Sequence, residues 1–225
     1  MLRRRLQMAG NGGGSILPAE LQGCEYLETD GNCYIDTGIL YNSTDEIIIK
    51  LSIDTTANNY IFGSYRNLGG GNNRYSFVGY RKSDSIFCVE RTRNGTLVQL
   101  NANDTIENII FEIAGIAMKI KDFDGNVIAQ RNAYNDSYST DRNITLFAAN
   151  HLGTIEYATN GKIYNFYCLN KRNMYSCYIK SGQTYTDNKG NICPAGTCGM
   201  YDIVNHVFYT NDGTGNFTNG ADIEI

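Results

Sequence analysis

The stretch GMYDIVNHVFYTNDGTGNF, from Gly199 to Phe217, sets short aromatic and β-branched runs beside clusters of Asn, Asp, Gly and Thr. Aromatic rings beside carboxamides and carboxylates are typical of a sugar-binding or calcium-binding loop, and also of a tight β-hairpin. We favour the hairpin, with a two-residue turn within Val204–Val207. Asn211–Gly215 is then the next reversal, where two glycines give backbone freedom. Phe217 is expected to close a hydrophobic core.

The same pattern extends back along the chain. EIIIKLSI, at Glu46–Ile53, is a β-branched run that favours a strand over a helix. Turn signals recur every ~8–12 residues, a spacing typical of sandwiches and jelly rolls. Asp122–Asn126 and Asp187–Asn191 are interpreted as hairpin turns rather than calcium loops, because they lack the glycine and glutamate spacing of an EF-hand. The sequence predicts an all-β, two-sheet antiparallel β-sandwich of about a dozen strands.

Composition and charge exclude two classes of partner. No run approaches the ~20 apolar residues that a membrane span requires, so we expect no membrane partner. The formal net charge is −4, and three arginines near the N-terminus contribute +3, which leaves −7 on the rest of the chain. A mildly acidic body disfavours a nucleic-acid-binding surface, so we expect no nucleic-acid partner.

The first residues differ in composition from the rest. Residues 1–15 read as a basic, glycine-rich, extended N-terminal arm, and residues 16–225 as one sandwich domain. No apolar stretch follows the basic start, so we expect no Sec export and synthesis in the cytoplasm. We interpret the arm as a segment that anchors the protein to neighbouring subunits through Leu2, Arg3, Arg4, Arg5, Leu6 and Met8.

Candidate chemistry does not assemble into a catalytic or metal site. An odd number of cysteines, seven, made in a reducing compartment indicates thiols rather than a disulfide framework. Whether Cys193 and Cys198 pair stays open. Neither His151 nor His206 lies in a catalytic motif, and the paired carboxylates of sandwich-fold glucanases are absent, because the carboxylates are expected mainly in turns. We predict no enzyme activity, catalytic residue, cofactor or metal.

A sugar-binding surface is the remaining candidate. Tyrosine rings stack on sugars while their hydroxyls form hydrogen bonds. A cluster of tyrosines and arginines flanks the loop NLGGGNN, and the alternative is that these rings simply alternate between the core and a solvated sheet face. The residues are Tyr65, Arg66, Tyr75, Tyr80 and Arg81.

Four blocks together resemble a known family. GCEYLETDGNCYIDTGI, NITLFAAN, GKIYNFYCLN and GMYDIVNHVFYTNDGTGNF occur in this order between about Leu17 and Phe217. They resemble the concanavalin A-like (laminin-G-like) jelly-roll domains of gut phages, prophages and their bacterial hosts. The MLRRR start is similar to proteins of gut Bacteroidales phages, including crAss-like phages. The stretch SCYIKSGQTYTDNKGNICPAGTC is longer than the usual link before the last block.

The resemblance implies a concanavalin A-like jelly roll and, less directly, a role. Members resemble bacteriophage virion structural proteins, such as capsid decorations, head fibres and tail parts, or cell-surface adhesins. The implied partners are other virion proteins in a multi-subunit assembly and host-surface glycans. The implied location is the virion, after synthesis in the host cytoplasm. The alternative is a carbohydrate-binding adhesin module of a phage or gut bacterium.

Overall fold

The computed structural model describes residues 15–53, 59–66, 74–81, 86–91, 96–101, 106–114, 117–132, 139–151, 153–156 and 159–225. These residues form strands, turns and bends, with no helix among them, so the predicted all-β class is confirmed. It follows that none of the described segments is a helix suited to crossing a membrane. The predicted anchoring side chains Leu2, Arg3, Arg4, Arg5, Leu6 and Met8 lie outside the described residues.

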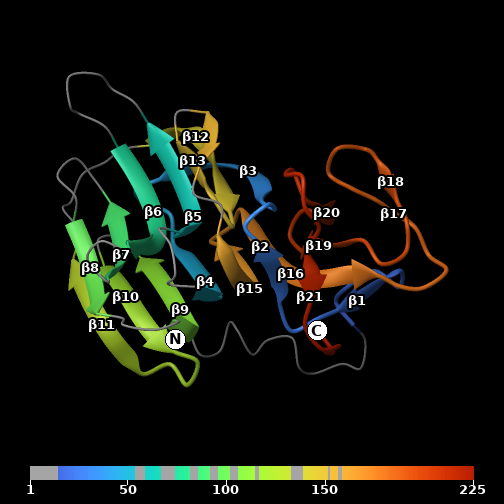
Figure 1. Ribbon diagram of the computed structural model, residues 1–225, viewed down its shortest axis with the longest axis horizontal. Helices are drawn as coiled ribbons and strands as arrows, with labels where there is room; N and C mark the ends of the chain where they lie inside the picture. Colours follow the sequence, from blue (N-terminus) through green and yellow to red (C-terminus); the bar gives the residue numbers. More distant parts are fainter. Residues whose placement is uncertain are drawn as a thin grey trace.

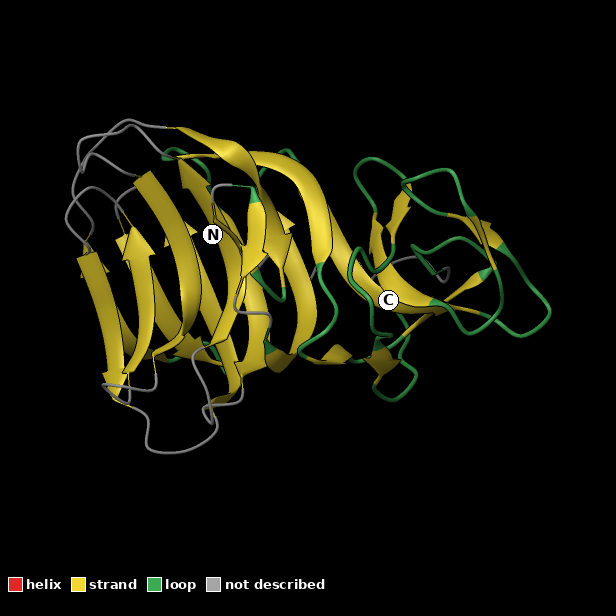
Figure 2. Cartoon of the chain, turned by 45° about the horizontal axis from the view of Figure 1, so that its top comes forward, coloured by secondary structure: helices red, strands yellow, loops and turns green. Residues whose placement is uncertain are grey.

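Two large sheets pack face to face (Figures 1 and 2), which confirms the predicted antiparallel sandwich. The larger sheet has 11 strands, eight of them in the order β11-β10-β9-β4-β15-β16-β19-β20. In addition, β1 pairs with β16, β2 pairs with β15, and β21 pairs with β2. Its strands are β1 (Leu21–Gly23), β2 (Leu27–Asp30), β4 (Ile47–Ile53), β9 (Ile106–Ala114), β10 (Ala117–Asp122), β11 (Val127–Asn132), β15 (Asn160–Cys168), β16 (Arg172–Ile179), β19 (Cys198–Asp202), β20 (Val207–Tyr209) and β21 (Thr218–Asn219).

The smaller sheet has eight strands and follows β14-β13-β5-β6-β7-β8, with β12 joining β5 to β3. Its strands are β3 (Ile35–Asn42), β5 (Asn59–Arg66), β6 (Arg74–Arg81), β7 (Ile86–Arg91), β8 (Thr96–Asn101), β12 (Ser139–Leu146), β13 (Ala149–His151) and β14 (Thr154–Glu156). One single-residue pairing, Asn150 with Ser64, is parallel, while the other ladders are antiparallel.

The main core lies between the two sheets and follows from alternation along the strands. In β4, Ile47, Ile49, Leu51 and Ile53 are fully buried and pack into the main hydrophobic cluster. Side chains of a strand alternate between faces, so the intervening residues point to the outer face of the larger sheet. Phe217 joins the same cluster and its ring centroid lies 5.0 Å from that of Phe147, which confirms its predicted closing role.

A second, smaller core lies under the long stretch before the last block. There β17 (Tyr185–Thr186) and β18 (Ile192–Cys193) form a two-stranded sheet, seen at the right of Figure 1. The larger sheet continues into this lobe through β16 and β19 (Figure 1). The buried members of this second cluster are Leu17, Leu21, Cys177, Ile179, Cys193, Tyr201 and Phe208.

The terminal hairpin is confirmed, but its turn is longer than predicted. β19 and β20 pair with Asp202 opposite Val207, so the loop holds four residues, Ile203–His206, instead of two. His206 adopts a positive φ of 58° and donates its backbone N–H to the Asp202 carbonyl at 2.8 Å. The Asp202 carboxylate accepts a bond from the Val204 amide, which stabilises the wider loop.

The glycines of the next reversal are needed for a different reason than predicted. Neither Gly213 nor Gly215 has a positive φ. A Cβ on Gly213 would overlap the carbonyl oxygen of Asn32, and one on Gly215 would lie 2.9 Å from Cys33 Sγ. Glycine is therefore required because the 211–215 loop approaches the β2–β3 connection closely. It is not required by an unusual backbone conformation. The reversal itself is confirmed.

Both aspartate-rich turns are hairpin turns, as predicted. Asp122 accepts bonds from the backbone and side chain of Asn126 in the β10–β11 turn, where Gly125 has a φ of 87°. Asp187 accepts equivalent bonds from Asn191 in the β17–β18 turn. In each case the carboxylate bonds to its own loop, which is the ordinary role of aspartate in a turn, and Asp187 also accepts bonds from Thr210 and Cys193.

A buried ion pair connects the two layers beside the terminal hairpin. Asp202 is fully buried, and its Oδ2 lies 3.4 Å from Arg172 Nε. Asp202 also accepts bonds from the Asn173 amide and the Asn205 side chain. Arg172 Nη2 donates to the carbonyl of Thr37 on β3 at 3.0 Å. The pair therefore joins the β19–β20 hairpin to the opposite sheet.

We expect Asp202→Ala to lower the free energy of unfolding by roughly 3 kcal/mol, because it removes the counter-charge of the partly buried Arg172 and the acceptor of the Asn173 amide. Asp202→Asn should cost less, since its amide oxygen still accepts a backbone bond. Urea denaturation of both variants tests this, with the exposed Asp141→Ala as the control. A midpoint for Asp202→Ala that matches the control would contradict the prediction.

Candidate functional site

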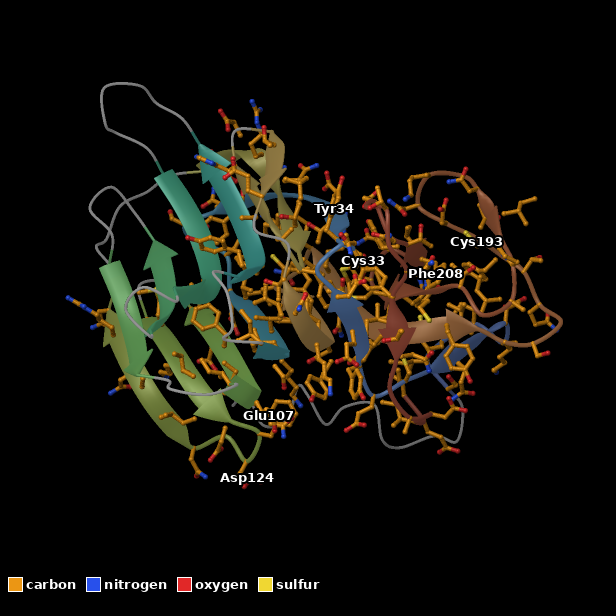
Figure 3. All side chains as sticks on the ribbon, viewed as in Figure 1. Cys33, Tyr34, Glu107, Asp124, Cys193 and Phe208 are labelled. Atoms are coloured by element: carbon orange, nitrogen blue, oxygen red, sulfur yellow. The ribbon has the colours of Figure 1, made fainter. Side chains whose placement is uncertain are left out.

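A hollow of about 740 Å³ crosses one end of the larger sheet on its outer face, and we call it the outer trough. It spans the starts of β9 and β15, the end of β4, β2 and the residues before β21. Glu107, labelled in Figure 3, marks its β9 end. Its half-buried aromatic residues are Tyr26 and Tyr164, and its polar lining includes Glu28, Ser52, Glu107, Asn108, Lys162 and Asn216.

Three aromatic rings form a row along this face. The centroids of Tyr26 and Tyr164 are 5.5 Å apart, and those of Tyr164 and Phe123 are 5.0 Å apart, both pairs meeting edge to face. Phe123 comes from the β10–β11 turn and is 37% exposed. Such edge-to-face contacts hold the rings in fixed orientations. The row therefore presents a rigid, partly apolar surface beside the polar trough.

Two β-bulges direct side chains into the trough. Between β15 and β4 the register shifts at Tyr164, since Ile163 and Asn165 pair with the adjacent residues Leu51 and Lys50. Between β4 and β9 a second shift places Glu107 and Asn108 together opposite Ser52. Asn108 has a positive φ of 53°, which asparagine tolerates better than most residues. Bulges re-aim side chains in this way and are frequent at functional sites.

A short hydrogen-bond chain fixes the two bulges to each other. Tyr164 Oη donates to Asn108 Oδ1 at 2.9 Å and lies 3.4 Å from Ser52 Oγ. The Asn108 amide donates to Ser52 Oγ at 2.9 Å. Because these bonds lie on strands rather than on long loops, the trough is formed before any ligand arrives.

The charge of the trough is predominantly negative. Four carboxylates line it, from Glu25, Glu28, Asp30 and Glu107, beside one ammonium among its described lining residues, from Lys162. Lys162 Nζ lies 4.4 Å from the centroid of the Tyr26 ring and 4.0 Å from Glu28 Oε1. Partial burial alone would lower the pKa of Lys162, yet the Glu28 carboxylate and the Tyr26 hydroxyl raise it above its ordinary value. Lys162 therefore stays charged.

The carboxylates of the trough correct one expectation from the sequence. Acidic side chains were expected mainly in turns, but Glu28 and Asp30 lie on β2 and Glu107 on β9. The strand carboxylates are nevertheless open to water, with the Glu28 side chain 45% exposed. A glycosidic general acid instead needs apolar surroundings that keep it protonated. Among the described residues, no three His, Cys, Asp or Glu side chains converge as metal ligands.

The tyrosine and arginine cluster predicted from the sequence lies elsewhere, on the smaller sheet. Tyr65 on β5 is opposite Tyr75 on β6, Arg66 is opposite Arg74, and Tyr80 and Arg81 end β6. The side chains of Tyr65, Arg66, Tyr75, Tyr80 and Arg81 lie outside the described residues. A glycan site there stays a prediction.

Sequence reasoning missed the outer trough, although one signal was present. In GKIYNFYC, Lys162 and Tyr164 flank Ile163, and in EYLETD, Glu28 and Asp30 alternate with buried residues. This alternation marks an outer face. It does not show that the two segments are neighbours, because Lys162 and Glu28 pair only in the tertiary structure.

The six cysteines with described side chains are free thiols, which confirms the prediction for them, and Cys193 and Cys198 are not paired. Burial raises the pKa of Cys24 and of Cys168 to about 12, and that of Cys177 well above its usual range. Cys193 donates to Asp187 Oδ2 at 3.7 Å. The Cys88 side chain lies outside the described residues.

Comparison with known proteins gives distant structural likenesses. No family model and no curated sequence matches the chain. Among solved structures, the chain is similar to the CBM40 of the Ruminococcus gnavus IT-sialidase bound to α2,6-sialyllactose, with a TM-score of 0.47, 15% identity, and 69% of this chain and 92% of that one covered. It is also similar to the NanB sialidase of Streptococcus pneumoniae, as the K499G mutant, with a TM-score of 0.45, 15% identity, and 93% and 39% covered.

A leech intramolecular trans-sialidase gives a TM-score of 0.42 at 12% identity, over 88% of this chain and 38% of that one. The chain thus spans well under half of either of these two sialidase chains. Likenesses of this level do not carry over a ligand or a reaction.

We expect the native protein to react slowly with a thiol reagent such as Ellman's reagent at about pH 8, because raised pKa values keep the buried thiols protonated. In a concentrated guanidinium solution, all seven cysteines of the sequence should react. Titration of released chromophore before and after denaturation measures this. A denatured count of five or fewer would reveal a disulfide and contradict the thiol interpretation.

Proposed function

We propose that this protein is a non-enzymatic glycan-binding β-sandwich, and that the outer trough is its binding surface. The observation that carries the proposal is the row of Tyr26, Tyr164 and Phe123 beside a hollow lined by carboxylates and carboxamides. A sugar ring has apolar C–H faces and a rim of hydroxyls. Tyrosine and phenylalanine rings match the first, and Asn, Asp and Glu side chains match the second.

The shape and rigidity of the trough support the same proposal. Its volume of about 740 Å³ lies within the usual range for small-ligand sites. Tyr164 is held by the Asn108 bond and by contacts with two flanking rings, so its orientation is set in the free protein. A preorganised site loses little conformational entropy when it binds.

The carboxylates of the trough favour binding of a glycan without its cleavage. Glu25, Asp30 and Glu107 are exposed, and Glu28 Oε1 lies 4.0 Å from Lys162 Nζ. None of them has the apolar shielding that keeps a catalytic carboxylic acid protonated near neutral pH. Hydrogen bonding to sugar hydroxyls, in contrast, requires only that these oxygens accept.

We expect Tyr164→Ala to weaken retention on a glycan array about tenfold, since a lost ring contact is worth roughly 0.5–1.5 kcal/mol beyond its buried area. Tyr164→Phe keeps the ring, loses the bond to Asn108, and should weaken binding less. The matched control is Tyr175→Ala, a half-buried tyrosine on β16 that does not line the trough.

Three results of this experiment would count against the proposal. Retention that is unchanged in Tyr164→Ala but lost in Tyr75→Ala would move the site to the smaller sheet. Absence of retention on every glycan would reject glycan binding. Release of oligosaccharides from the bound glycans, abolished in Glu28→Gln or Glu107→Gln, would reject the non-enzymatic part.

A second candidate concerns where the protein works. The four sequence blocks and the MLRRR start favour a bacteriophage virion structural protein that displays the sandwich on the particle. The two candidates are compatible, because a surface component of a virion can also bind host glycans. As a virion protein, it would contact neighbouring subunits through the arginines of residues 1–14.

We expect deletion of residues 1–14 to leave thermal melting nearly unchanged while removing the protein from purified phage particles. The physical reason is that the sandwich core is built from residues after Ser15, whereas the arm supplies intersubunit contacts. Quantitative mass spectrometry of the particles measures the outcome. Full occupancy by the truncated protein would reject the anchoring role of the arm.

A further inference from the structure

The outer trough is long in one direction. It crosses neighbouring strands in the order β9, β4, β15, β2 and β21, which pair consecutively. Neighbouring strands lie ~4.8 Å apart, so four spacings extend for about 19 Å. A sugar ring in an extended chain advances by a distance similar to one such spacing. The trough therefore has the length of about four sugar units.

The β21 end of the trough adjoins a second hollow. Asn216 lines the outer trough and also a neighbouring hollow of about 520 Å³. That hollow is lined by uncharged residues, among them Thr197, Thr210, Asn211 and Phe217. A site for a terminal sugar is closed at one end by protein. Here an exposed asparagine stands between two adjoining hollows, so a chain can continue past it.

The aromatic row runs in the same direction as the trough. Tyr26 directly precedes β2, Tyr164 lies on β15, and Phe123 follows β10, which pairs with β9. The rings therefore succeed one another across the strands, with centroids 5.5 and 5.0 Å apart. The row therefore offers apolar ring surface at more than one position along the trough.

The charge of the outer trough favours some glycan chains over others. Four carboxylates face the trough and Lys162 is already paired with Glu28 and stacked on Tyr26. A polyanionic chain would bring like charges together, and this repulsion opposes binding. A neutral chain avoids this cost and still receives hydrogen bonds.

We propose that the outer trough binds an internal stretch of a linear, non-anionic glycan, about four units long, rather than a single terminal sugar. This inference rests on the proposed function. It adds the length, the position within the chain and the charge class of the glycan.

Isothermal titration with size-defined ladders of one to six units tests the proposal, using β-1,4-linked N-acetylglucosamine, mannose and xylose as neutral probes and oligogalacturonides as the anionic probe. For at least one neutral ladder, affinity should rise at least tenfold from one to four units and then level off. Oligogalacturonides of the same lengths should bind more weakly.

Variants at the two ends of the trough test the length directly. Glu107→Ala and Asn216→Ala remove side chains from opposite ends, so each should weaken binding of the four-unit probe more than that of the two-unit probe. Thr184→Ala, in the distant β17–β18 lobe and outside the trough, is the control. An equal loss for both probe lengths would overturn the proposed span.

The remaining outcomes separate this inference from the proposed function. Equal affinity for one and four units overturns the internal-chain inference while leaving glycan binding intact. Tighter binding of oligogalacturonides overturns the charge class. Absence of binding to all four ladders overturns the inference as a whole, and the glycan array with Tyr164→Ala then decides whether glycan binding itself stands.

Discussion

The ion pair between Asp202 and Arg172 links the terminal hairpin to both layers of the sandwich. Asp202 is fully buried, and a buried carboxylate is costly unless its charge and its lone pairs are satisfied. Its partners come from β16, from the β19–β20 loop and, through Arg172, from β3 in the opposite sheet. Satisfying one charge therefore fixes the relative positions of three segments that are far apart in the chain.

The position of the larger sheet in turn sets up the outer trough. Core-facing isoleucines of β4 and β15 anchor these strands against the smaller sheet, which leaves Lys162 and Tyr164 on the outer face. Gly161 contributes to this arrangement, because a Cβ there would lie 2.7 Å from the carbonyl oxygen of Ser52. The close approach of β15 to β4 brings Tyr164 within reach of Asn108, so the packing of the core and the geometry of the site are linked.

Much of the fold was predictable because its signals are local. The Ile-rich run of β4, the Asp-Gly turn at Asp124–Gly125 and the terminal hairpin are encoded within a few residues each. The prediction was wrong where a distant segment sets the geometry. At the four-residue β19–β20 turn, the Asp202 carboxylate also accepts a bond from the distant Asn173 amide, and Gly213 is required by Asn32. Neither partner is near in sequence.

The sequence by itself determined the all-β class, the sandwich, the buried face of runs such as β4 and the acidity of the body, since period-two alternation and charge are properties of the chain. It predicted about a dozen strands where the described residues form 21, because short strands such as β17 and β18 are defined only by their partners. Only the tertiary structure decided the site. The trough exists because two bulges turn Tyr164 and Asn108 toward each other, across 56 residues of chain. A bulge is a mismatch between two paired strands, so it is defined only when the partner strand and its register are known.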